Sequence, residues 1–186
     1  MELPEHESVF GALSDFCGHY ETWDEFAALV EEALEENPGL SCAEGYLSRL
    51  VEVYLELGAT EYTDRIEHVC VRLLSYEDAE VMGLRQLVEL NEQSENWTEC
   101  IKWYSRLMEH ADGAQSETDG YLKIAEYNAR SMSQAGQLDA LRLAFNSSPE
   151  SLNILDEMID LRESMADYED MVLLLRERIE VAQDDE

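Results

Sequence analysis

Five stretches of the chain repeat one pattern, in which an aromatic residue or a leucine is followed by apolar residues about three, four, seven and eleven positions later. On an α-helix this spacing places the apolar side chains on one face. Each stretch is therefore predicted to be an amphipathic helix that begins at its leading residue and packs there against the helix before it. We call the five leading residues the anchors, and they follow one another at intervals of roughly 30 to 40 residues: Trp23, Tyr62, Trp97, Leu138 and Tyr168.

Polar residues precede three of the anchors and support these helix starts. Thr22, Asn96 and Asp167 stand directly before an anchor, and an acidic residue follows each of them three positions later. A side-chain oxygen at such a position can accept a hydrogen bond from a free backbone N–H, and the acid suits the positive end of the helix dipole.

A second set of helices is predicted between the anchored ones, over residues 4–19, 40–58, 77–93, 116–135 and 149–165. The turn signals are Asn37-Pro38-Gly39, Gly136 as the end of the fourth of these helices, and Ser148-Pro149-Glu150 as the start of the fifth. The longest connection, residues 111–116, is a possible hinge.

The predicted fold class is all-α, an α-solenoid of about five antiparallel helical hairpins, or ten helices. A single hairpin of this length cannot bury its apolar face alone, whereas stacked hairpins bury a continuous core. We expect one domain over residues 1–186.

The anchor segments resemble tetratricopeptide repeats. Residues 95–99 (Glu-Asn-Trp-Thr-Glu) and 166–170 (Ala-Asp-Tyr-Glu-Asp) are similar to the start of that family's second helix, which has Gly, then Asp or Asn, then an aromatic residue, then acids. Pro38 and Gly136 match its repeat-closing proline and turn glycine. The small residue that the family has three positions after the anchor is replaced by Phe26, Arg65, Cys100, Leu141 and Met171.

This resemblance implies a right-handed superhelix whose groove, lined by the first helix of each repeat, binds a partner. The family's geometry assigns seven candidate partner-binding residues to that groove: Arg85, Glu89, Lys123, Arg130, Asp156, Asp160 and Glu163. Their spacing of four and three also places the last three acids on one helix face. We expect that face to meet a basic segment.

The charge excludes several classes of ligand. The chain has 43 Asp and Glu against 12 Lys and Arg, a net charge of −31. Such a chain repels nucleic-acid phosphates and anionic membrane surfaces. Two interpretations stay open, a strongly solvated surface and a surface that meets a basic partner.

No motif for catalysis, a cofactor or a metal is present in the sequence. It has no Gly-rich phosphate loop, no GxSxG and no HExxH, and its four histidines are scattered over more than one predicted element: His6, His19, His68 and His110. Cys70 and Cys100 lie on apolar stripes and are expected in the core. With no signal peptide visible, a reducing cytoplasm is the expected location.

The leading functional hypothesis is a non-catalytic interaction module, an adaptor, scaffold or chaperone-like protein that binds a basic or amphipathic segment of a partner protein. One alternative is a structural subunit of a larger assembly that docks through its edge helices, over residues 4–19 or 167–182. Another is an acidic mimic of nucleic acid that inhibits a DNA-binding protein.

Overall fold

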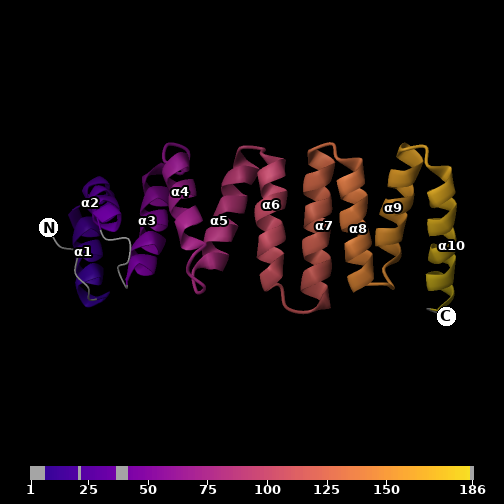
Figure 1. The fold of residues 1–186 in the computed structure, drawn as a ribbon, viewed down its shortest axis with the longest axis horizontal. Helices are drawn as coiled ribbons and strands as arrows, with labels where there is room; N and C mark the ends of the chain where they lie inside the picture. The colour runs from indigo at the N-terminus through magenta and orange to yellow at the C-terminus, as the bar shows by residue number, and fades with distance from the viewer. Residues whose placement is uncertain (1–6, 21, 37–41, 185–186) are drawn as a thin grey trace. The chain divides into compact units, whose positions relative to one another are not determined.

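A computed structural model describes residues 7–20, 22–36 and 42–184 of the chain, and within them the prediction of an all-α fold is confirmed. These residues form ten α-helices and one short 3-10 helix, with no strand among them (Figure 1). The predicted turn at Asn37-Pro38-Gly39, the start of the helix predicted over 4–19, and His6 lie outside the described residues.

The chain divides into two compact units, Met1–Leu90 and Asn91–Glu186. The helices of the first unit are α1 (Glu7–Tyr20), α2 (Trp23–Glu36), α3 (Ala43–Gly58), α4 (Thr63–Leu73) and most of α5 (Glu80–Gln93). The second unit contains α6 (Trp97–Leu107), the 3-10 helix η1 (Met108–His110), α7 (Ala114–Arg130), α8 (Gln134–Ser147), α9 (Leu152–Ser164) and α10 (Tyr168–Asp184). One domain over the whole chain stays a prediction.

In the first unit, a core of aromatic and aliphatic side chains forms where α2, α3 and α4 pack together. Phe26, Tyr46, Leu50 and Ile66 are among its fully buried residues. They come from helices whose apolar residues recur at helical spacing, and their burial removes one stripe of each helix from water.

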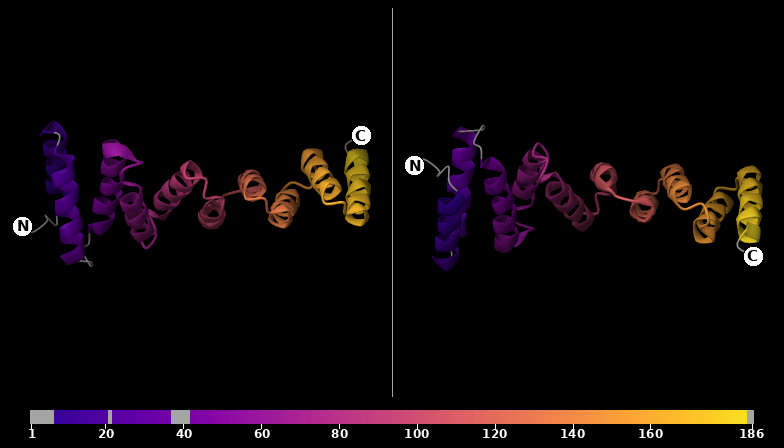
Figure 2. Two further views of the ribbon diagram at one scale, coloured as in Figure 1. Left: turned by 90° about the horizontal axis from the view of Figure 1, so that it is seen from above. Right: turned by 90° about the horizontal axis from the view of Figure 1, so that it is seen from below.

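In the second unit, neighbouring helices pack in chain order. The buried cluster joins Ile124 of α7, Leu138 and Leu141 of α8, Leu155 of α9 and Leu174 of α10. Figures 1 and 2 show α9 and α10 side by side at the C-terminal end of this series. The series ends at α10, so one side of α10 has no following helix among the described residues.

Three turns of the second unit share one backbone geometry. Glu95, Met132 and Ala166 have positive φ angles of 56°, 60° and 56°. In each turn, the N–H of the following residue donates to a carbonyl five residues earlier, as from Ser133 to Asn128 at 2.8 Å. This is the Schellman arrangement at a helix C-terminus, which glycine usually occupies. Here glycine's place is taken by ordinary L-residues, which adopt this conformation at a cost.

Two predicted helix boundaries are wrong. Gly136 does not end a helix, because α7 stops at Arg130 and Gly136 lies in the first turn of α8. There its N–H donates to the Ser133 hydroxyl at 3.3 Å. A side chain at Gly136 would also collide with Asn128, whose Oδ1 lies 2.1 Å from the position of an added Cβ. Residues 149 and 150 form a turn, and α9 begins only at Leu152.

The predicted caps differ in outcome. The Asp167 carboxylate accepts a hydrogen bond from the backbone N–H of Asp170 at 3.3 Å, as its sequence position predicts. Asn96 stands directly before α6, but its side chain makes no capping hydrogen bond. The helix start at Trp97 therefore rests on packing rather than on the asparagine.

The anchors pack to different degrees. Leu138 is buried, and the half-buried Trp23, Tyr62 and Trp97 make ring contacts with Phe26, Tyr54 and Tyr127, respectively. The prediction for Tyr168 as a packing residue is wrong, because its side chain is 61% exposed. The physical reason is its position on the face of α10 that is turned away from α9, whereas Leu174 of the same helix is buried.

Candidate functional site

The seven predicted partner-binding residues fall in both units. Arg85 and Glu89 of α5 are exposed and belong to the first unit, while the other five belong to the second. One shared surface for all seven stays a prediction. Within the second unit, the structure brings the predicted residues into two groups with different surroundings.

The first group is an ion-pair network on α7. Lys123 lies 3.2 Å from Glu92 and 3.0 Å from Glu126, and Arg130 lies 2.7 Å from Glu126. Partial burial lowers the pKa of Lys123, but the hydrogen bonds that its ammonium group donates to Glu126 and Glu92 outweigh this effect and raise the pKa above its ordinary value. Both predicted cations are thus already engaged by carboxylates of this chain.

Aromatic side chains lie beneath this network. The Tyr127 hydroxyl donates to Glu92 at 2.7 Å, and burial together with this bond raises the tyrosine's pKa. Trp97 stacks on Tyr127, and the Arg130 guanidinium lies 4.8 Å from the Trp97 ring centroid. The network therefore joins the C-terminal end of α5, the start of α6 and α7, which is a structural role.

The second group is the set of acids on α9. Asp156 is half-buried and forms a two-point ion pair with Arg178 of α10, in which Nη2 donates to Oδ2 at 3.2 Å and Nε donates to Oδ1. The Arg178 hydrogen bond lowers the pKa of the Asp156 carboxyl. Asp160 and Glu163 are exposed. Asp160 and Glu163 therefore remain the candidate residues on this face for contact with a partner. The sequence did not indicate that Asp156 has an ion-pair partner within the chain.

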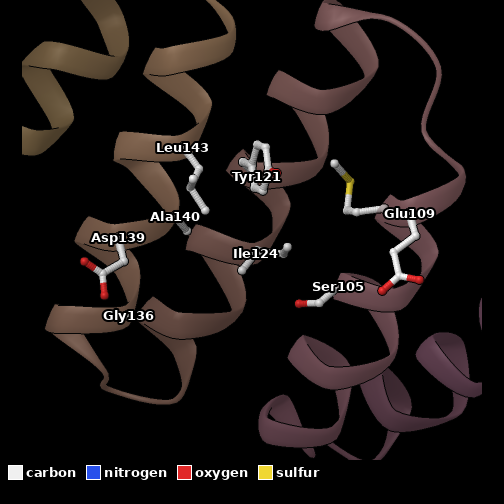
Figure 3. Close-up of a pocket in the computed structure, with 9 residues that line it drawn as sticks. Ser105, Glu109, Tyr121, Ile124, Gly136, Asp139, Ala140 and Leu143 are labelled. Atoms are coloured by element: carbon white, nitrogen blue, oxygen red, sulfur yellow. The ribbon is translucent and has the colours of Figure 1, made fainter.

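A pocket of about 450 Å³ lies elsewhere in the second unit, between α6 with η1, α7 and α8 (Figure 3). Met108, Tyr121, Ile124, Ala140 and Leu143 make up its apolar part. Figure 3 shows that carboxylates stand on both sides of this apolar part, from Glu109 on η1 and from Asp139 on α8, with the hydroxyl of Ser105 near the former.

Two glycines shape this pocket. Gly136 lines it and allows the start of α8 to lie against Asn128 of α7. Gly120 has the Met108 sulfur 1.7 Å from where a Cβ would stand, so a side chain at this position would force the Met108 side chain to move. Sequence reasoning missed this site, although the small residues at 120 and 136 were the available signal.

The pocket and the α7 ion-pair network occupy opposite faces of α7. At 3.6 residues per turn, Tyr121 and Ile124 point to one side of the helix, while Lys123, Glu126 and Arg130 point to the other. The pocket is therefore separate from the groove that the tetratricopeptide resemblance implies.

Two further features bear on function. No group of three or more His, Cys, Asp or Glu side chains in the described part of the chain is placed to hold a metal ion. Cys70 and Cys100 are fully buried, as predicted. Burial raises their pKa values to about 12 and about 11, so both thiols stay protonated at neutral pH.

None of the described helices combines the length and the apolar character that a membrane crossing requires.

Comparison with known proteins shows similarity only at the level of the fold. No family model matches the sequence, and no curated protein matches it. Among solved structures, a double mutant of MamA RS-1 has a TM-score of 0.50 at 11% identity, covering 98% of this chain and 99% of its own. A crystal structure of a MamA protein has a TM-score of 0.50 at 12% identity, covering 95% and 91%.

The TPR2AB domain of yeast Sti1, in a complex with pHSP90, is also similar, with a lower TM-score of 0.41 at 13% identity and coverage of 90% of this chain and 74% of that one. MamA contains tetratricopeptide repeats, and its likeness to this chain extends over nearly the whole length of both. The chain therefore has a tetratricopeptide-like helical-repeat fold, as the resemblance of its anchor segments implies.

Proposed function

We propose that this protein is a non-catalytic interaction module that binds a basic, amphipathic segment of a partner protein. The observation that carries the proposal is the pocket between α6, α7 and α8, in which an apolar surface is flanked by two carboxylates. An apolar side chain fits against Tyr121, Ile124 and Leu143. A lysine or arginine on either side of that side chain would then meet Glu109 or Asp139.

The energetics of such a site suit a segment rather than a small polar ligand. Apolar burial supplies most of the affinity, at about 25 cal/mol per Å². The flanking charges supply orientation and a faster encounter, and the net charge of −31 adds long-range attraction for a basic partner. Helical-repeat folds present such surfaces on rigid, packed helices.

The experiment uses a labelled amphipathic helical peptide with leucines on one face and lysines beside them. Its control is the same peptide with glutamates in place of the lysines. Fluorescence anisotropy should show binding of the lysine peptide only, with affinity that falls as salt rises. Amide chemical shifts should change most around Tyr121, Ile124 and Ala140.

Three matched double variants locate the site, since each removes two negative charges. Glu109→Gln with Asp139→Asn should weaken binding at low salt by about fivefold or more. Asp160→Asn with Glu163→Gln tests the face predicted from the sequence, and Glu61→Gln with Asp78→Asn tests net charge alone. Equal effects of all three would show that only overall charge matters, and a larger effect of the α9 pair would move the site to that face.

A further inference from the structure

The outer face of α10 carries a stripe of exposed apolar side chains. Tyr168, Val172, Leu175 and Ile179 are 61%, 44%, 38% and 54% exposed, respectively. Their spacing of four, three and four places them on one side of the helix. The stripe extends over about 16 Å at 1.5 Å per residue. We call these four residues the α10 stripe.

Two of the equivalent positions in the preceding hairpin are covered. Leu138 and Phe145 of α8 stand where α10 has Tyr168 and Leu175, and they are buried and half-buried, respectively, whereas the exposed Arg142 stands in the place of Val172. Both pack in the core to which α9, the helix after α8, contributes Leu155 and Met158. The α10 stripe is therefore a helix-packing face that lacks its covering helix in the described residues.

The charges beside the stripe indicate what can cover it. Glu169, Arg176 and Glu180 are exposed along one flank of the stripe, so that an arginine lies between two glutamates. A uniformly basic helix would place a cation against Arg176. An antiparallel helix of mixed charge would instead place a cation against Glu169 and an anion against Arg176.

The α10 helix itself has this pattern. When two copies of α10 lie antiparallel, Tyr168 faces Ile179 of the second copy and Val172 faces Leu175 of the second copy. In the same register, Glu169 lies across from Arg176 of the second copy, and the pair occurs twice because the arrangement has two-fold symmetry. We propose that the α10 stripe mediates homodimerisation of this protein through antiparallel α10 helices.

Homodimerisation does not involve the pocket, and its salt dependence differs from that of peptide binding. Two chains of −31 repel each other, so screening by salt should strengthen the dimer. Binding of a basic peptide to the pocket should weaken under the same conditions. Because four residues per chain make a small interface, we expect a dissociation constant in the micromolar range.

Sedimentation velocity over a concentration series of the whole chain, at low and at high salt, tests the proposal. A monomer–dimer equilibrium that shifts toward the dimer at high salt is the expected result. A monomer at every concentration in both salts would overturn it.

Substitutions then locate the interface. Ile179→Glu should raise the dissociation constant at least tenfold, whereas Leu173→Glu, on an equally exposed leucine away from the stripe, should change it little. Circular dichroism checks that both variants stay folded. Equal effects of the two substitutions would place the interface elsewhere.

A charge exchange provides the sharpest readout. Arg176→Glu and Glu169→Arg should each weaken the dimer, because each places like charges across the interface. The chain that carries both substitutions should dimerise as the original does, because the opposite charges again face each other. Failure of the double variant to recover would contradict the antiparallel register.

Discussion

The Trp97 ring stacks on the Tyr127 ring, with centroids 6.2 Å apart and planes inclined by 20°. Trp97 begins α6 and Tyr127 lies near the end of α7, so the contact joins two consecutive helices of the second unit. Arg130 of the same helix also lies over the indole, with its guanidinium 4.8 Å from the ring centroid. Trp97 is thus held by contacts with a buried tyrosine and a cation although it is itself only half-buried.

Trp97→Ala should lower the free energy of unfolding by about 2 kcal/mol. A fully buried tryptophan costs about 3–5 kcal/mol when it is reduced to alanine, and a half-buried one loses roughly half of that together with its ring contacts. Tyr168→Ala, at the equivalent anchor of α10, should cost less than about 0.5 kcal/mol because that ring is exposed. Urea unfolding of the two variants measures the difference, and similar losses would contradict the assigned burial.

Met132→Gly should stabilise the protein by about 0.5–1 kcal/mol. Met132 has a φ of 60° and a largely exposed side chain, so glycine relieves backbone strain there without opening the core. Ala129→Gly, at an exposed position in the last turn of α7, is the matched control and should destabilise by a similar amount. Thermal unfolding should show changes of opposite sign, and a loss of stability in both variants would refute the turn geometry.

The pair of Asp156 and Arg178 should stabilise the fold only above acidic pH. The Arg178 hydrogen bond lowers the pKa of the Asp156 carboxyl below its ordinary value of 3.8. Its contribution is therefore fully present above the unfolded pKa and disappears as pH falls through the lowered folded pKa. The stability difference between the original protein and Asp156→Asn should be constant near neutral pH and vanish in strong acid.

Glu157→Gln, at an exposed position beside Asp156, is the control for this pH series and should not reproduce the dependence. Urea unfolding at several pH values measures both variants. A difference for Asp156→Asn that persists below the folded pKa would mean that the substitution acts through packing instead of charge.

Moderate salt should raise the melting temperature by about 3 °C or more, equivalent to about 1 kcal/mol for a chain of this size. The net charge of −31 leaves many carboxylates without a cation, and screening reduces their repulsion in the folded state. Scanning calorimetry across a salt series, at a concentration where the protein is monomeric, provides the measurement. No change would show that the carboxylates are already neutralised locally.

The sequence by itself determined the fold class, the existence of the described helices and most of the anchor positions. The reason is that helical periodicity is a local property, so Trp97 with Cys100 and Leu138 with Leu141 mark a buried face wherever the next hairpin packs. Helix ends were less certain, because the turns at Met132 and Ser151 depend on backbone geometry that their residue types do not indicate.

Only the tertiary structure decided which of these faces is covered. Tyr168 has the same sequence pattern as Trp97, but it is exposed because no described helix packs over it. The spacing of Asp156 and Asp160 places them on one helix face. Asp156 nevertheless forms an ion pair with Arg178, which is 22 residues away in the chain. The pocket between α6, α7 and α8 arises from three helices at once, and a one-dimensional pattern contains no information about the space left between them.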